Sequence, residues 1–358
     1  MQIKQLKISH FRCYEHIDLS FDKRINVFYG ANGSGKTTVL EAIYFISTGK
    51  SFRSKRNKNL IQHDQSGLAV FAHFLDQSHN QNNLGITLSK SLKKKVKLNQ
   101  QSINNQSDVA HVLPVVSIDP DSYLFLDKPP QFRRSYFDWL VFHVKPEYLV
   151  IWSKVNRCHK QLNTLYKEKK LQDLIYWESQ YIHYASQLNE LREQIFDELK
   201  TAVCQKVALF LPELGDFEPT YRQGWSQERS LSEQIKIDRD KNLLFGNLLS
   251  GCHKMDIKSN INKKPAHENL SRGQKKIISS IYYISYIELL SAHLSINPIL
   301  CLDDMDAELD PSKTAIFSDF IQNSNNQIFI TTVDKEKLST DTKDTAVFHV
   351  EHQQVSLI

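Results

Sequence analysis

The length and composition of the chain are those of an ordinary globular protein. It has 358 residues, 41% of them hydrophobic and 24% charged, and its 45 basic and 40 acidic side chains give a net charge of +5. These values exclude a disordered, collagen-like or disulfide-dense chain, and the length indicates about two domains of ~150 residues each. The mild basic excess allows an acidic partner without requiring one.

The cysteines and the N-terminus favour a cytoplasmic location. The five cysteines are odd in number and include no Cys-x-x-Cys pair, which disfavours a disulfide framework or a zinc site. The chain's opening sequence, MQIKQLKISHFRCYEHIDL, lacks the long apolar core of a signal peptide. We therefore expect a protein of the reducing cytoplasm.

The first predicted elements are three strands and a helix. Apolar and polar residues alternate over residues 3–8 and 16–21, and a short apolar run over residues 25–29 ends at a glycine. After Gly35, the sequence KTTVLEAIYFIS has the three- and four-residue apolar spacing of a helix. This order places one conspicuous loop between a strand and a helix.

That loop, GANGSGKTT, is the strongest motif of the chain. It matches G-x-x-x-x-G-K-[ST], whose glycines let backbone N–H groups face phosphate oxygens while the helix N-terminus faces the same anion. Lys36 is expected to neutralise the β- and γ-phosphates of a nucleotide, and Thr37 to bind Mg²⁺. A chance match in a glycine-rich turn is disfavoured because the chain has only 11 glycines. The predicted nucleotide-binding residues of the loop are Gly30, Ala31, Asn32, Gly33, Ser34, Gly35, Lys36, Thr37 and Thr38.

Two basic clusters follow, in residues 53–110, which read as further strands and loops. Either cluster could contact DNA phosphates by counterion release, without sequence preference. The alternative is a solvated, lysine-rich strand edge that prevents aggregation. The first cluster comprises Arg53, Lys55, Arg56 and Lys58, and the second comprises Lys90, Lys93, Lys94, Lys95 and Lys97.

The sequence becomes helical between about Pro146 and Phe210. Its apolar stripes, one of which includes Trp152, predict two long antiparallel helices joined near Lys167–Gln172. Such a pair projects as an arm or packs into a bundle, and the sequence leaves both possibilities open. Residues 213–265 are polar and irregular, and we assign no elements to them.

The segment NLSRGQ, residues 269–274, opens a long apolar helix. Ser271 and Gln274 match a capping box, so a well-capped helix is one complete interpretation. In the other interpretation, the Ser271 hydroxyl, the Gly273 amide and the helix N-terminus bind a phosphate. Residues 277–296 are long enough to span a membrane, but their charged and polar residues predict a buried core helix instead.

An apolar strand ending in two carboxylates follows, PILCLDD at residues 298–304. A buried strand with acids at its carboxyl end is where an α/β sheet keeps its ligand. We expect Asp303 to hold Mg²⁺ and Asp304 to polarise the attacking water, with Lys36 completing the catalytic set. A strand followed by an acidic turn is the alternative.

These motifs, in this order, resemble those of ABC-type ATPases. LSRGQ resembles the signature motif of that family, and Glu308-Leu309-Asp310 resembles its D-loop. Lys36 and Asp303 are 267 positions apart, which is more than a minimal ATPase needs. The helical residues 146–210 therefore read as an insertion, as in the SMC-like DNA-repair ATPases.

The resemblance is most specific to the RecF family. It covers most of the chain and is weak over residues 55–110 and 160–250. The similar segments are the opening KQLKISHFRCYEHIDLSF with Phe11-Arg12, the phosphate loop, LEAIY, GKSFR, Pro120-Asp121, RRSYFD, LSRGQKK, LDDMDAELD and IFITT.

The resemblance implies an α/β fold: an ABC-type P-loop ATPase head with a β-rich subregion and an inserted helical, short coiled-coil-like lobe. The expected boundaries are residues 1–140 for the first part of the head, 141–211 for the lobe and 212–358 for the rest. It also implies an ATP-dependent homodimer in which Lys36 of one subunit and Ser271, Gly273 and Gln274 of the other hold the same ATP and Mg²⁺.

The implied activity is that of a DNA-repair clamp. The ATP-bound dimer would bind duplex DNA, or a junction of single and double strands, without sequence preference. It would act with RecR-like and RecO-like partners to help load RecA at gaps during replication, recombination and the response to DNA damage. A weak, DNA-stimulated ATP hydrolysis would release it. No membrane partner is expected.

Several positions depart from the family pattern. Asp304 stands where ABC ATPases carry Glu, Thr332 where they carry a switch histidine, and Ala307 where the RecF D-loop opens with Ser. The shorter Asp304 side chain suits a timing switch. A segment resembling Gly-Pro-His-Arg is here Gly251-Cys252-His253-Lys254. Arg12 either reaches the nucleotide or forms a surface salt bridge.

Other functions fit the sequence less well. An SMC- or ABC-like ATPase of a DNA-defence or nuclease-coupled system would need a nuclease domain, for which the 358 residues leave no room. A transporter ATPase would carry Glu beside Asp303, a middle-loop Gln and a switch histidine. A small-molecule kinase would leave LSRGQ and ELD unexplained.

Overall fold

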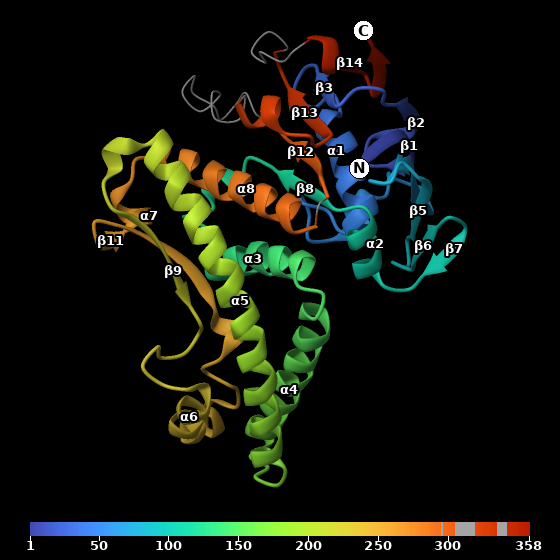
Figure 1. The fold of residues 1–358 in the computed structure, drawn as a ribbon. Coiled ribbons are helices and arrows are strands. Elements are labelled where there is room, and N and C mark those ends of the chain that lie inside the picture. The colour runs from blue at the N-terminus through green and yellow to red at the C-terminus, as the bar shows by residue number, and fades with distance from the viewer. Residues whose placement is uncertain (295, 305–318, 335–341) are drawn as a thin grey trace. The chain divides into compact units, whose positions relative to one another are not determined.

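The chain forms two compact units in the computed structural model, which describes residues 1–294, 296–304, 319–334 and 342–358 (Figure 1). Unit 1 comprises residues 1–123 and 295–358, and unit 2 comprises residues 124–294. The second unit is therefore an insertion into the first. The predicted α/β class with an inserted, largely helical part agrees with this organisation.

The insertion is larger than the sequence suggested. The boundaries expected after residues 140 and 211 followed a change from mixed to helical texture, whereas the contacts divide the chain after residues 123 and 294. The reason is that the strands and helices on both sides of the two long helices pack onto them. The segment NLSRGQ consequently belongs to the inserted unit.

An antiparallel sheet of six strands forms one layer of unit 1, in the order β2-β1-β4-β5-β6-β7. Burial alternates along its strands, as expected for a sheet with one face on the core. The strands are β1 (Gln2–Phe11), β2 (Tyr14–Ser20), β4 (Gly67–Leu75), β5 (Gln81–Ser89), β6 (Lys94–Leu98) and β7 (Gln101–Ile103).

A second sheet of unit 1 has the order β15-β14-β3-β13-β12-β8, and all its strands except β15 run parallel to their neighbours. The central strands are buried along almost their whole length, which fits a parallel sheet covered on both faces. The strands are β3 (Ile25–Tyr29), β8 (Val115–Ile118), β12 (Ile299–Leu302), β13 (Ile328–Thr332), β14 (Thr345–Glu351) and β15 (Gln354–Leu357).

Helix α1 (Lys36–Thr48) joins the two sheets of unit 1. It contacts β1, β4 and β5 of the antiparallel sheet and β8, β12 and β13 of the other, and ten of its thirteen residues are buried. This explains why both faces of α1 are apolar. Unit 1 also contains the helix α2 (Gln106–Val112), and short 3₁₀ turns lie at η1 (Asn57–Leu60), η2 (Ser122–Leu124) and η6 (Thr342–Asp344).

Two long helices dominate unit 2, as predicted. Helix α4 (Tyr148–Glu168) and helix α5 (Leu174–Phe210) lie side by side and are joined by residues 169–173 (Figure 1). The buried face of α4 includes Val155 and Leu162, but Trp152, expected in the same stripe, is 40% exposed. The interface on α4 is therefore narrower than the sequence pattern indicated.

The segment without assigned elements folds around these helices. It contains β9 (Phe217–Arg222), which pairs with β10 (Asp256–Ile261), and the capped helix α6 (Leu231–Phe245). Its strands were not recognised because they are short and one contains a proline, Pro219. The other elements of unit 2 are α3 (Pro130–Val144), η3 (Pro212–Leu214), η4 (Cys252–Lys254), β11 (Lys264–Pro265), α7 (Ala266–Asn269) and α8 (Arg272–Leu294).

Helix α8 is the apolar helix that could be mistaken for a membrane span. It is the one helix of the described residues that is long and apolar enough, and 67% of its apolar window is buried. It packs against α3 and α5, so it has the environment of a core helix. The prediction of a buried helix agrees with these contacts.

Buried ion pairs hold the RRSYFD segment of α3 in place. The guanidinium of Arg133 lies 2.8 Å from a carboxylate oxygen of Asp256, and Arg192 of α5 lies 2.8 Å from Asp138. Removing one partner of such a pair leaves an uncompensated buried charge and costs ~3–5 kcal/mol. This segment therefore has a structural role within unit 2.

Candidate nucleotide site

The phosphate loop lies between β3 and α1 of unit 1, at the carboxyl end of the parallel strand. Gly30 and Gly35 have φ angles of 155° and 114°. A Cβ atom at Gly30 would lie 2.2 Å from the Val350 carbonyl oxygen, and one at Gly35 would lie 2.7 Å from the Tyr14 hydroxyl oxygen. The loop therefore needs glycine at both positions, which the motif predicted.

Lys36 is the first residue of α1 and is almost fully buried, with 4% exposure. Its Nζ donates hydrogen bonds to the carbonyl oxygens of Gly30 (2.8 Å) and Ala31 (3.0 Å). The ammonium group thus lies across the glycine loop that would surround a phosphate. The glycine backbone, the buried cation and the helix N-terminus together fit a nucleoside triphosphate.

Asp303 lies beside Thr37, although 266 positions separate them in sequence. The Thr37 hydroxyl donates to Asp303 Oδ1 at 2.8 Å, and the Thr331 hydroxyl donates to the same oxygen at 2.7 Å. This brings together the two residues predicted to bind Mg²⁺. Hydroxyl and carboxylate oxygens at the edge of a phosphate loop are the donors that Mg²⁺ prefers, so the set fits that ion.

The environment of Asp303 shifts its titration. Burial raises the pKa of the carboxyl group, and the hydrogen bonds from Thr331 and Thr37 partly offset the shift. A nearby cation would favour the ionised form, because it replaces the lost hydration of the charge. A bound Mg²⁺ would therefore offset part of the cost of burying the Asp303 charge.

Asp304 follows directly and has an unusual backbone. Its φ angle is 47°, in the left-handed region that Asp adopts more readily than most residues. Its backbone N–H donates to the Thr331 hydroxyl at 2.8 Å. Thr331 therefore connects the Asp303 carboxylate and the Asp304 backbone to β13.

Thr331 is the residue that the sequence interpretation missed. The sequence pattern indicated Thr332, at the switch-histidine position, but the Thr332 hydroxyl donates to the Asp334 carbonyl oxygen at 2.8 Å and is fully buried. The alternation of a strand explains the difference, because neighbouring side chains point to opposite faces. The sequence shows two adjacent threonines, but only the register of β13 shows which of them contacts Asp303.

Arg12 contacts α1 through a buried acid. Its guanidinium donates two hydrogen bonds to Glu41, at 2.7 and 2.9 Å, and Glu41 is fully buried. Of the two expected roles for Arg12, the structure has an ion pair, but one that anchors the helix after the phosphate loop rather than a surface one. The ion pair keeps Glu41 compensated in the core.

The first basic cluster is divided. Arg53 Nη1 lies 3.9 Å from a carboxylate oxygen of Glu41, and its charge opposes the rise in the Asp303 pKa that burial causes, so it sits beside the nucleotide site. Lys55 and Arg56 are exposed, with Lys58 nearby. The DNA role predicted for Arg53 therefore competes with a position near these carboxylates.

The second cluster is divided by strand alternation. Lys95 and Lys97 lie on the face of β6 opposite the buried Val96, whereas Lys94 shares the side of Val96. The Lys94 ammonium lies near Gly49 at the end of α1, and partial burial lowers its pKa. Lys90 and Lys93 lie in the exposed turn between β5 and β6. The five lysines do not form one patch.

Ser271 caps α8 in unit 2. Its hydroxyl accepts a hydrogen bond from Gln274 N at 3.2 Å, and Gln274 Oε1 accepts one from Ser271 N at 3.0 Å. The predicted capping box is therefore present, and the cap is exposed to solvent, as is Arg272 beside Gly273. The phosphate-binding interpretation remains compatible with it. The predicted D-loop, Glu308-Leu309-Asp310 with Ala307, lies outside the described residues.

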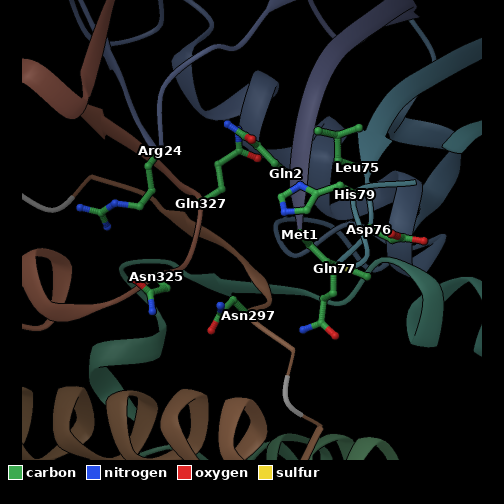
Figure 2. Close-up of a pocket in the computed structure, with 10 residues that line it drawn as sticks. All are labelled: Met1, Gln2, Arg24, Leu75, Asp76, Gln77, His79, Asn297, Asn325 and Gln327. Atoms are coloured by element: carbon green, nitrogen blue, oxygen red, sulfur yellow. The ribbon is translucent and has the colours of Figure 1, made fainter. Parts of the chain in front are cut away.

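Unit 1 also has a polar hollow of about 450 Å³ where β3 and β13 begin, at the opposite strand ends from the phosphate loop (Figure 2). It is lined largely by amide side chains, with Arg24, His79 and the N-terminal Met1. Arg24 donates hydrogen bonds to Asp344 and to two carbonyl oxygens, so it serves the fold. None of the predicted site residues lines this hollow.

Comparison with known proteins identifies a family over the whole chain. Residues 2–356 match the model of the RecF/RecN/SMC N-terminal domain. The DNA replication and repair protein RecF of Shewanella oneidensis is 32% identical, with 100% of both chains covered. That of Pseudoalteromonas atlantica is 33% identical, with 99% of both chains covered.

Solved structures show the same fold. A RecF–ATP structure, described as a recombination mediator of the RecFOR pathway, superposes with a TM-score of 0.90 at 21% identity and covers 100% of this chain and 97% of that one. The Smc head domain of Pyrococcus furiosus superposes with a TM-score of 0.58 at 16% identity, covering 100% and 96%. The fold is therefore that of an ABC-type ATPase head with an inserted helical lobe.

Proposed function

Because the chain belongs to the RecF family, we propose that it is an ATP-dependent DNA clamp of DNA replication and repair, acting in the cytoplasm. It binds ATP and Mg²⁺, dimerises on ATP and binds DNA without sequence preference. Slow ATP hydrolysis then releases the DNA. The relatives named RecF support the biological role. The phosphate loop and its acidic partners support the chemistry.

One observation carries the proposal: the hydrogen bond between Thr37 and Asp303, which unites the two halves of the predicted magnesium site from opposite ends of the chain. A chance phosphate-loop motif would not bring a carboxylate to its threonine. The contact therefore favours a working nucleotide site over a glycine-rich turn.

Each residue of the site has a defined task in this proposal. Lys36 exchanges the Gly30 and Ala31 carbonyl oxygens for the β- and γ-phosphates. Thr37 and Asp303 hold Mg²⁺, which neutralises phosphate charge. Asp304 accepts a proton from the attacking water.

The second half of the nucleotide contact comes from another subunit. Ser271, Gly273 and Gln274 lie at the exposed N-terminus of α8, where backbone N–H groups and the helix dipole favour a phosphate. In the ATP-bound dimer this end of α8 contacts the nucleotide of the opposite subunit. ATP then acts as the linker between subunits, and its hydrolysis opens the dimer.

DNA would be bound by exposed cations of both basic clusters: Lys55 and Arg56, and the β5–β6 lysines Lys90, Lys93, Lys95 and Lys97. Phosphate contacts of this kind position DNA without reading its sequence. The clamp would act with RecR-like and RecO-like partners to help load RecA at gaps.

Light scattering tests the proposal on the Asp304→Asn protein, in which ATP persists. A shift from monomer to dimer on adding ATP and Mg²⁺ supports a clamp. A monomer that binds ATP without dimerising would point to a different phosphate-loop enzyme. The same variant with Lys36→Met is the control and should remain monomeric.

A further inference from the structure

Helix α4 exposes a tryptophan outside the predicted sites. Its buried face contains Tyr148, Val155 and Leu162, which recur every seven residues. Trp152 lies at the margin of that face and keeps 40% of its surface exposed. An exposed aromatic ring of this size leaves apolar surface in water unless something covers it.

Trp152 forms one end of a shallow groove of about 460 Å³ along α4. The groove extends to Thr164 and includes Asn156, Arg157 and Lys160. Apart from the adjacent pair Asn156 and Arg157, neighbouring members of this set lie three or four positions apart, so they share one side of the helix. Trp152 and Thr164 are twelve positions apart on the helix, which gives the groove a length of about 18 Å.

The face is basic, and its cations are not neutralised by acids. Helix α4 carries four Lys or Arg residues and one acidic residue, whereas α5 carries three and five. Among the described residues, neither Arg157 nor Lys160 has a carboxylate within 4 Å. Arg157 instead lies 6.0 Å from the centre of the Trp177 ring. The charge of this face is therefore available to an anionic partner.

We propose that this groove of α4 binds single-stranded nucleic acid. Trp152 stacks on an unpaired base, Arg157 and Lys160 contact the adjacent phosphates, and the Asn156 amide meets a base edge. An aromatic platform beside cations is the combination that binds single strands, because every base has a stackable face. A double helix keeps its bases stacked on each other and offers no face to Trp152.

An acidic peptide is the competing occupant, and the exposed ring decides against it. The cations of the groove would bind an acidic peptide as readily as a phosphate. A peptide carboxylate, however, cannot stack on the exposed indole ring. The inference goes beyond the proposed function, since it adds a nucleotide-independent site, and it rests on that function only in taking nucleic acid as the partner.

The test measures binding of fluorescein-labelled (dT)20 to the full chain by anisotropy, without ATP. Trp152→Ala should weaken binding about tenfold, and Trp152→Phe, which keeps a ring, should weaken it less. The double variant Arg157→Glu, Lys160→Glu should weaken binding strongly and flatten its salt dependence. Lys236→Glu with Lys241→Glu, two exposed residues of α6, is the matched control for net charge.

Four results would overturn the inference. The first is wild-type affinity for (dT)20 in both the Trp152→Ala and the Arg157→Glu, Lys160→Glu proteins. The second is an equal loss of affinity in the α6 control. Displacement of (dT)20 by polyglutamate at equal charge concentration would show a general anion surface. Loss of (dT)20 binding in Lys36→Met would place the DNA at the nucleotide-dependent clamp.

The proposed clamp is tested separately by the same proteins. The α4 variants should keep ATP-dependent dimerisation and duplex binding, because their changes lie outside the phosphate loop and the signature segment. Lys36→Met should lose both and still bind (dT)20. Failure of one proposal therefore leaves a different pattern from failure of the other.

Discussion

The phosphate loop and the signature segment are both predicted to hold ATP, but they differ in how the chain completes them. At the phosphate loop, Asp303 is hydrogen-bonded to Thr37 across 266 positions. At the signature, Ser271 is hydrogen-bonded to Gln274, three positions away. The first site is assembled by the fold, whereas the second is complete as a helix cap.

The two segments therefore differ in how far the structure of one subunit indicates a role in ATP binding. The polar groups of the phosphate loop and its acids make sense together only as a ligand site, because burying Asp303 and Lys36 costs free energy that folding alone does not require. The Ser271 cap has a sufficient local reason to exist. Its role with ATP therefore has to be tested in the dimer.

The largest effect is expected at the assembled site. Lys36→Met should weaken ATP binding roughly a thousandfold, because the triphosphate loses a buried cation worth about 4 kcal/mol. Calorimetric titration of ATP measures it. Lys50→Met, which removes an exposed lysine just beyond α1, is the matched control. Wild-type ATP affinity in the Lys36→Met protein would show that the loop does not bind the triphosphate.

Asp304→Asn should slow ATP hydrolysis roughly a hundredfold with ATP affinity unchanged, because an amide cannot accept the proton of water. Phosphate release under saturating ATP is the measurement. Unchanged turnover would transfer the catalytic role to another group, such as the Asp119–Asp121 loop. Comparing turnover with ATP affinity therefore separates ATP hydrolysis from ATP binding at the phosphate-loop part of the site.

Asp303→Asn should reduce the contribution of Mg²⁺ to ATP affinity roughly tenfold or more, since a neutral amide is a weaker ligand than a carboxylate. Without nucleotide or Mg²⁺, the same substitution should raise the stability of the folded protein. Because burial raises the Asp303 pKa, the ionised carboxylate costs stability above that pKa, and the cost disappears as the pH falls.

Thermal unfolding in EDTA, without nucleotide, measures the second effect. The Asp303→Asn protein should melt above wild type at about pH 8, and the difference should shrink as the pH falls through the raised Asp303 pKa. A variant less stable than wild type over this whole pH range would mean that Asp303 serves the fold rather than a ligand.

The smallest effect is expected at the DNA-binding lysines. Lys95→Glu with Lys97→Glu should weaken ATP-dependent duplex binding severalfold and reduce its salt slope, because both side chains point to solvent. Lys94→Glu should matter less, because its ammonium lies over the end of α1. Equal losses from both proteins would contradict the division of the cluster by strand alternation.

The sequence predicted the parts of the site that depend on local chemistry. The glycines, Lys36 and Thr37 form a contiguous motif whose geometry is nearly fixed by residue type. Asp303 and Asp304 were predicted because an apolar strand ends there. The long helices of unit 2 followed from apolar spacing, and α4 and α5 lie where it placed them.

What the sequence could not predict depends on register and packing between distant segments. Thr331 contacts Asp303 only because β13 lies beside β12 in a particular register. Lys94 separates from Lys95 for a similar reason, and Trp152 is exposed because the contact of α4 with α5 is narrow. The limits of unit 2 were missed because β9 and β10 are short strands, and because the packing of β9 on α5 joins segments distant in sequence.

The central claim is that Ser271 belongs to a nucleotide site shared between subunits, and one measurement tests it most directly: ATP-dependent dimerisation of Ser271→Arg by light scattering, in the Asp304→Asn background. We predict normal ATP binding by each subunit, about 1 kcal/mol of lost stability from the broken cap, and no dimer. Ser230→Arg, which breaks the corresponding capping box of α6, should lose similar stability and still dimerise. Normal dimerisation of Ser271→Arg, with only its stability reduced, would show that Ser271 is a helix cap and contradict the shared site.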